Sequence, residues 1–129
     1  MPCSDETFAR VDFFFYVLEK TVIYTPGDNE WVDCYRTGNG RFDPQERLAR
    51  LREVFFASAQ SHGKRRLAYA RQGVDPRYAK FVENASFAHN GIQFATLHIV
   101  GSNNNFQRTR AQAAEHAERN AANIAWTRK

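Results

Sequence analysis

A cluster of oxygen-bearing side chains follows a short apolar run in the first third of the chain: Asp28, Asn29, Glu30 and Asp33. Residues 22–24 are β-branched or aromatic and predict a strand, which Pro26-Gly27 would end. Ligands of open α/β sheets bind beyond the carboxyl ends of strands, and hard metal ions prefer carboxylate and amide oxygens. The cluster therefore predicts a site for a divalent metal ion. An ordinary turn, in which Asp and Asn bond the local backbone, is the structural alternative and the commoner role of such a run when it stands alone.

The segment 24–36, Tyr-Thr-Pro-Gly-Asp-Asn-Glu-Trp-Val-Asp-Cys-Tyr-Arg, resembles a signature of a subgroup of calcineurin-like metallophosphoesterases. In most of that superfamily the corresponding block reads Gly-Asn-His-Asp or Gly-Asn-His-Glu, and Gly27 matches its glycine. Asp28 stands where the metal-bridging Asn sits, Asn29 where the His sits, and Glu30 at the acidic position. Two further blocks of the same subgroup follow in the expected order, at residues 95–104 and 119–126.

The resemblance implies metal-dependent hydrolysis of phosphate esters, with divalent metal ions as cofactors. Asp28 and Glu30 would be metal ligands, Asn29 would face the phosphate, and Arg36 would neutralise substrate charge. Asn can donate a hydrogen bond to a developing oxyanion, but it cannot act as a general acid near neutral pH. The subgroup commonly has Cys-His-Arg where this chain has Cys-Tyr-Arg at residues 34–36, which removes one candidate acid or base.

Three residues of the second block are candidates for substrate binding: His98, Asn103 and Asn104. The alternatives are a core histidine satisfied by hydrogen bonds, which is the commoner case, and asparagines that cap the following helix. Related sequences often carry cysteines where this chain has Cys3 and Cys34, so the resemblance also implies a disulfide bridge between them. An intracellular chain would keep them as thiols.

The set of metal-ligand motifs expected for the family is incomplete in this chain. The family has Asp-x-His and Gly-Asp-x-x-Asp before the central block, and a lone His and Gly-His-x-His after it; residues 1–129 contain none of these in the expected places. We therefore expect a single, incomplete phosphoesterase domain with little or no activity alone.

The composition leaves two other hypotheses about function open. The net charge of +4 and the basic residues Lys64, Arg65, Arg66 and Arg71 would suit a small module that binds anionic partners such as nucleic acid. A solvated surface is the commoner role of such a run, which disfavours nucleic acid as a partner. A translated gene remnant without function is the third reading. The chain has no apolar run of about 18 residues and no signal-peptide pattern, so we expect it to be soluble, untargeted and independent of membranes.

The predicted fold is α/β, with α+β as the alternative: a partial layered sheet flanked by helices. Ser4 should cap a first helix whose buried face carries Phe8, Val11, Phe15 and Leu18, widened by Phe13 and Phe14. Asp43 and Pro44 should start a second helix that ends at Gly63.

The second half of the chain predicts a hairpin followed by a helix. Asn90-Gly91 lies between two β-type runs, 81–88 and 92–100, and the second run is apolar on both faces, which predicts a buried strand. The Ala-rich segment 109–126 predicts a helix whose packing stripe is formed by Ala113, Ala117, Ala121 and Ile124.

Overall fold

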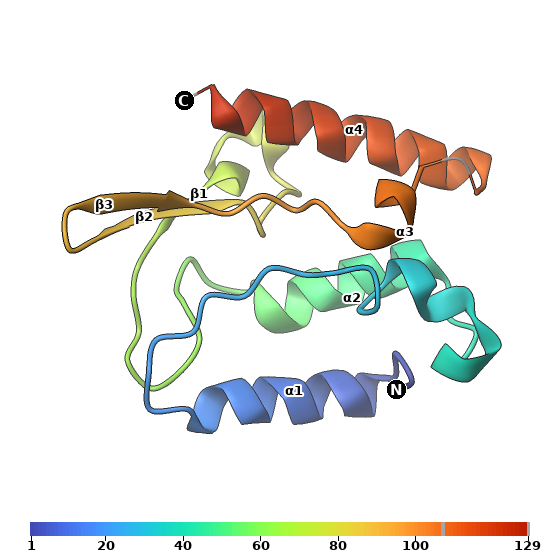
Figure 1. The fold of residues 1–129 in the computed structure, drawn as a ribbon, viewed down its shortest axis with the longest axis horizontal. Helices are drawn as coiled ribbons and strands as arrows, with labels where there is room; N and C mark the ends of the chain where they lie inside the picture. The colour runs from blue at the N-terminus through green and yellow to red at the C-terminus, as the bar shows by residue number, and fades with distance from the viewer. Residues whose placement is uncertain (107, 129) are drawn as a thin grey trace.

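The long helices of the chain lie in layers. The computed structural model describes residues 1–106 and 108–128. Figure 1 shows α1 (Asp5–Val17) at the bottom, α2 (Pro44–Phe55) above it and α4 (Arg110–Thr127) at the top, with an extended segment, in orange, running between α2 and α4. None of the described helices is long and apolar enough to cross a membrane.

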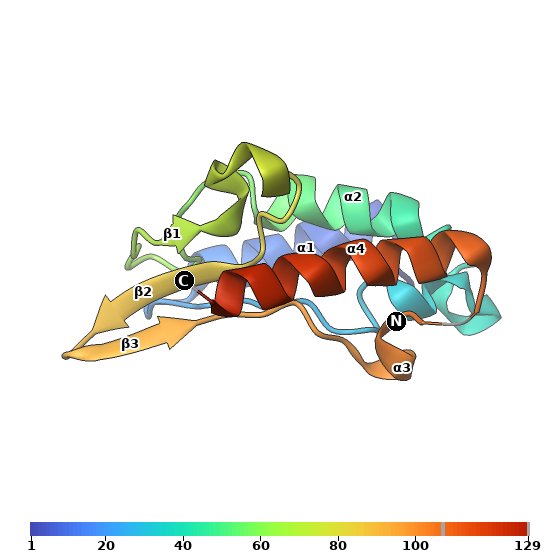
Figure 2. The ribbon, with the colours of Figure 1, turned by 90° about the horizontal axis from the view of Figure 1, so that it is seen from above.

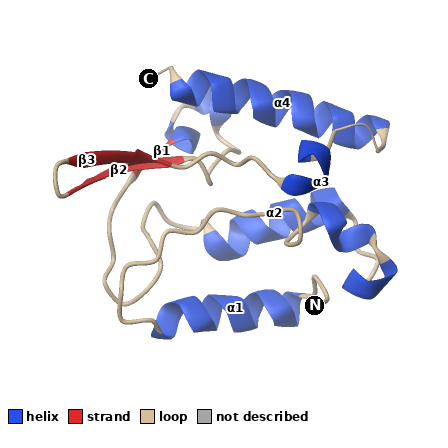
Figure 3. Cartoon of the chain, in the orientation of Figure 1, coloured by secondary structure: helices blue, strands red, loops and turns tan. Residues whose placement is uncertain are grey.

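Short helical turns, drawn in blue in Figure 3, and loops, drawn in tan, connect these layers. The turns are η1 (Val32–Tyr35), η2 (Thr37–Asn39), η3 (Gln72–Val74), η4 (Pro76–Tyr78) and α3 (Gly101–Asn104).

Polar caps start the long helices where the sequence predicts them. The side chain of Ser4 accepts a hydrogen bond from the Thr7 N–H at the start of α1, and Asp43 accepts one from Glu46 at the start of α2. Helix α2 ends at Phe55, so the predicted end at Gly63 is wrong. Residues 56–63 leave the helix because they bond to neighbouring segments, for example in the bridge between His62 and Val22.

The sheet is small and antiparallel. Its strands β1 (Ala70–Arg71), β2 (Ala85–His89) and β3 (Ile92–Ala95) lie in that order, which confirms a mixed helix-and-sheet class, in its α+β form. Asn90 and Gly91 both have positive φ, as a two-residue hairpin turn requires, so the predicted hairpin is confirmed. Figure 2 shows this hairpin projecting beyond the ends of the helices.

Two predicted strands are shorter than expected. The run 22–24 makes a single bridge rather than a strand. The strand predicted over 92–100 ends at Ala95, and all of β3 is exposed rather than buried. The chain leaves the ladder because a side chain takes over the backbone bonding: the His98 N–H donates to Asn84 Oδ1.

The apolar core lies between α1, α2 and the segment that follows residue 24. Its buried members are Phe8, Trp31, Val32, Leu48, Leu51, Phe55, Phe56 and Val100. Phe13 and Phe14 are 65% and 57% exposed, so the prediction that they widen the buried face of α1 is wrong. Helix α1 forms the bottom layer in Figure 1, and only its Phe8, Val11 and Phe15 side packs on the core.

Helix α4 packs through a polar face, which corrects the predicted alanine stripe. Its buried residues are Gln112, Arg119, Ala122 and Asn123, whereas Ala117, Ala121 and Ile124 are exposed. The surface below the helix presents backbone carbonyls, including that of His98. Donor side chains satisfy these carbonyls, and an alanine stripe could not.

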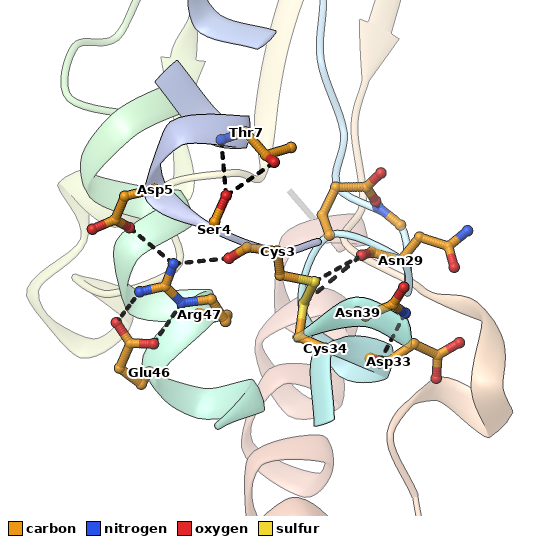
Figure 4. Close-up of a disulfide and its surroundings, with 12 residues drawn as sticks. Cys3, Ser4, Asp5, Thr7, Asn29, Asp33, Cys34, Asn39, Glu46 and Arg47 are labelled. Atoms are coloured by element: carbon orange, nitrogen blue, oxygen red, sulfur yellow. Dashed lines mark hydrogen bonds and ion pairs between the residues drawn. A yellow bond between two sulfur atoms is a disulfide. The ribbon is translucent and has the colours of Figure 1, made fainter. Parts of the chain in front are cut away.

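A disulfide joins Cys3, just before α1, to Cys34 in η1. Both cysteines are buried, and the Asn29 carbonyl oxygen lies 3.4 Å from Cys3 Sγ and 3.8 Å from Cys34 Sγ (Figure 4). The bridge therefore fixes the start of the chain against the segment that carries the acidic cluster.

Replacement of both cysteines by alanine should lower the free energy of unfolding by about 3–4 kcal/mol, because the bridge spans a sequence separation of 31 residues. Urea unfolding followed by circular dichroism measures this difference. The reduced wild-type chain serves as the control and should unfold at the same urea concentration as the double variant. Equal midpoints for oxidised and reduced wild type would contradict a stabilising role.

Candidate functional site

Two loops far apart in sequence meet at a pair of carboxylates. Ser102 Oγ lies 3.1 Å from Asp28 Oδ2 and 2.9 Å from Asp33 Oδ1. A hydroxyl carries one hydrogen, so Ser102 donates fully to one carboxylate at a time. Asp33 is only 4% exposed, and Asp28 is half-buried. Of the predicted cluster, Asp28 and Asp33 thus lie together, and Ser102 joins them.

The close approach to Asp28 requires a glycine at position 101. A Cβ atom on Gly101 would lie 2.4 Å from Asp28 Oδ2, which no side chain could tolerate without displacing the carboxylate. The next four residues, 102–105, all have φ between 49° and 62°, so α3 is a left-handed turn. Asn tolerates this conformation better than most residues. The Ser-Asn-Asn-Asn run therefore has a conformational role.

The buried guanidinium of Arg119 holds this turn in place. Its Nη1 donates to the His98 carbonyl at 2.8 Å and to Asn104 Oδ1 at 2.7 Å, and its Nη2 donates to the Asn104 carbonyl at 3.0 Å. Nε donates to Glu115 Oε1 at 2.7 Å, which supplies the counter-charge. The guanidinium carbon also lies 5.4 Å from the ring centroid of Trp31, so α4 contacts both loops of the candidate site.

A second buried chain of hydrogen bonds runs beneath the site. Trp31 Nε1 donates to His98 Nε2 at 3.1 Å, so His98 Nδ1 carries the ring hydrogen and donates to Glu83 Oε1 at 2.7 Å. Arg52 binds the same carboxylate through two nitrogens, at 2.6 and 3.0 Å.

The charges of Glu83 and His98 are set by burial and by their hydrogen-bond partners. Burial opposes ionisation of Glu83, but the hydrogen bond from His98 and the charge of Arg52 outweigh it and lower the pKa of Glu83 to about 2. Burial lowers the pKa of His98 despite the neighbouring carboxylate. His98 is 1% exposed with both ring nitrogens bonded, which favours the core-histidine alternative over substrate contact.

Glu30 does not join Asp28. Its Oε2 accepts the Gly27 N–H at 2.7 Å, and the side chain lines a different cavity, beside α1. Among residues 1–106 and 108–128, no three His, Cys, Asp or Glu side chains gather closely enough to hold a metal ion. These residues do not by themselves fit a two-metal centre, which needs ligands beyond a pair of carboxylates.

The other predicted site residues lie around the acidic pair. Arg36 forms an ion pair with Asp33, with 3.2 Å between Nη2 and Oδ1. Its hydrogen bond with Tyr35 and the charge of Asp33 raise the pKa of Arg36, so it stays cationic. Asn29 and Asn103 are exposed, and Asn29 lines the same cavity as Glu30. Asn104 instead supports the left-handed turn, since its side-chain oxygen also accepts the Val100 N–H.

Sequence reasoning missed two members of this surface. Ser102 lies inside a recognised block but was assigned no role. Arg108 lies outside every block, and its guanidinium carbon lies 3.4 Å from the ring centroid of Tyr35. Arg36 also approaches this ring, at 6.0 Å. Two cations thus share one aromatic ring next to the acidic pair, and only the tertiary fold could place Arg108 there.

The basic residues 64–66 and 71 are largely engaged in contacts within the protein. Lys64 pairs with Glu19, Arg66 donates to the Ser61 carbonyl, and Arg71 donates to the Phe56 carbonyl. Lys64, Arg65 and Arg66 are exposed, as a solvated surface requires.

All three blocks that carry the resemblance meet in space. Trp31 of the first block bonds to His98 of the second, and Arg119 of the third bonds to the backbone of the second. No protein-family model, curated protein or solved structure matches the chain.

Substitution of Arg119 by methionine should lower the free energy of unfolding by about 3–5 kcal/mol, because Glu115 and several carbonyl oxygens would stay buried without their donor. Urea unfolding measures the loss. The control is Arg110→Met on the exposed start of the same helix, which should cost less than about 0.5 kcal/mol. A similar effect of both variants would show that the buried network contributes little.

The buried hydrogen bonds of Glu83 and His98 also predict that the free energy of unfolding depends on pH. The pKa of Glu83 is lowered from 4.5 to about 2, so its contribution to stability is complete above pH 4.5 and is lost as the pH falls to about 2. The lowered pKa of His98 adds a loss that begins below pH 6.5, because the unfolded chain takes up that proton first. Urea unfolding at several pH values should show a shallower acid decline for Glu83→Gln than for wild type. Parallel declines would contradict this assignment.

Proposed function

We propose that this chain carries part of a metal-dependent phosphoesterase site, with Asp28 as a ligand for a divalent metal ion and a phosphate ester as the substrate. The observation that supports the proposal is the contact between Asp28 and the Gly101-Ser102 turn. The first two blocks that resemble the phosphoesterase subgroup lie far apart in sequence, and this contact joins them at the predicted acidic residue.

Each side chain has a defined part in the proposed site. Asp28 and the neighbouring Asp33 offer carboxylate oxygens, which suit hard divalent ions. A metal bound there would polarise the phosphoryl group and lower the pKa of a bound water. Arg36 would neutralise substrate charge, and the Asn29 side chain would donate a hydrogen bond to a phosphoryl oxygen. Glu30 is left out because its carboxylate is bonded to Gly27.

The chain alone should hydrolyse phosphate esters slowly or not at all. The described residues supply a pair of carboxylates, whereas a two-metal site needs more ligands and a second ion about 4 Å from the first. The remaining ligands would have to come from elsewhere in a complete enzyme. The basic-module alternative gains no support from the contacts, since Lys64, Arg66 and Arg71 are engaged locally.

Titration with Mn²⁺ tests the proposal. Paramagnetic broadening of amide resonances should centre on Asp28, Asp33 and Ser102, with a dissociation constant on the order of 1 mM. Asp28→Asn keeps the shape and the acceptor for Ser102 but removes the charge, so it should abolish the broadening. The matched control, Asp12→Asn on α1, should leave it unchanged.

Hydrolysis of bis(p-nitrophenyl) phosphate with Mn²⁺ provides the second readout. The wild-type chain should show no more hydrolysis than Asp28→Asn. Broadening that persists in Asp28→Asn would show that Asp28 is not a metal ligand. Hydrolysis by wild type that disappears in Asp28→Asn would support the ligand and contradict the claim that the site is incomplete.

A further inference from the structure

An aromatic cavity lies on the other side of the acidic block from Ser102. Its volume is about 480 Å³, and residues of α1, residues of the segment 24–30 and Phe55 of α2 line it. Four aromatic side chains contribute to its wall: Phe8, Phe15, Tyr24 and Phe55. Their ring centroids lie 5.1–6.0 Å from one another in the contacting pairs. Cavities of this size and lining commonly hold small organic ligands.

A carboxylate lies at the edge of this aromatic wall. Glu30 is the only charged side chain among the described residues that line the cavity. One of its oxygens accepts the Gly27 N–H, and the other makes no hydrogen bond to a described residue. Burial, followed by the charge of Glu30, raises the pKa of the Tyr24 phenol. The negative potential of Glu30 therefore extends to the aromatic wall.

The charge of Arg47, a basic residue close to the cavity, is compensated. The Arg47 guanidinium carbon lies 5.6 Å from the ring centroid of Phe8 but is not part of the cavity lining. Arg47 is ion-paired with Asp5 and with Glu46. Its charge is thus neutralised locally. The α-amino group of Met1, which also lines the cavity, is the other charge to weigh. Because Met1 is 82% exposed and Glu30 is half-buried, water screens the ammonium more than the carboxylate, and the carboxylate of Glu30 determines the sign of the charge that the cavity favours.

We propose that this cavity binds a small organic monocation with apolar substituents, of the quaternary ammonium class. Aromatic faces attract such cations, and one carboxylate supplies the counter-charge. An anion would be repelled by Glu30, and a neutral ligand would desolvate the carboxylate without compensation. A bare metal ion would find one carboxylate and an apolar wall in place of its oxygen ligands. The cavity and the proposed phosphoesterase site share Asn29, but the proposed metal ligand Asp28 faces Ser102 and does not line the cavity.

Choline and its neutral isostere 3,3-dimethylbutan-1-ol test this proposal directly. In a titration of the full chain followed by amide chemical shifts, choline should bind with a dissociation constant on the order of 1 mM. The shifts should centre on Thr7, Val11 and Glu30. The neutral analogue has the same shape and should bind at least about tenfold more weakly. Equal binding of the two compounds, or no binding of choline, would overturn the proposal.

Two variants separate the charge from the shape of the cavity. Glu30→Gln keeps an acceptor for the Gly27 N–H and should weaken choline binding about tenfold. The matched control, Glu6→Gln on the exposed first turn of α1, should have no effect. Val11→Phe keeps the charge but fills the cavity, and it should block choline while circular dichroism shows a folded chain. An equal loss for Glu30→Gln and Glu6→Gln, or unchanged binding by folded Val11→Phe, would overturn the assignment.

Discussion

The hydrogen bonds of the Arg119 guanidinium are the interaction on which the packing of α4 against the rest of the molecule depends. The guanidinium is fully buried, and its donors reach the His98 and Asn104 carbonyls while Glu115 supplies the counter-charge. A charge in such a position is costly unless every donor has a partner. Asn104 in the left-handed turn supplies two of those partners, so the turn and the helix stabilise each other.

A second buried network of charged and polar groups positions α2 against the segments beside it. The chain from Trp31 through His98 to Glu83 and Arg52 connects the acidic block, the extended segment after β3 and α2. Each group is satisfied only when all these segments are in place, so the network favours one arrangement over alternatives of similar apolar burial. The disulfide adds a covalent constraint on the same block from the N-terminal side.

Local signals in the sequence were sufficient for the helix starts and the hairpin turn, and insufficient for the lengths of the strands and for the packing. The caps at Ser4 and Asp43 and the Asn90-Gly91 hairpin depend on short-range chemistry and could be predicted. The polar face of α4 could not, because its partners are backbone carbonyls that no sequence pattern reveals. Glu30 and Arg108 follow the same rule: one turned toward a neighbouring cavity and the other reached Tyr35 only through the tertiary fold.

The single hydroxyl of Ser102 lies between Asp28 and Asp33 and can point its hydrogen at either carboxylate. Rotation about one C–O bond moves the hydrogen from one carboxylate to the other without any proton entering or leaving the protein. A cation bound at Asp28, as proposed, would turn the hydrogen toward Asp33 and leave the lone pairs of the Ser102 oxygen facing the cation. The acidic pair would then receive positive charge without a change in its protonation.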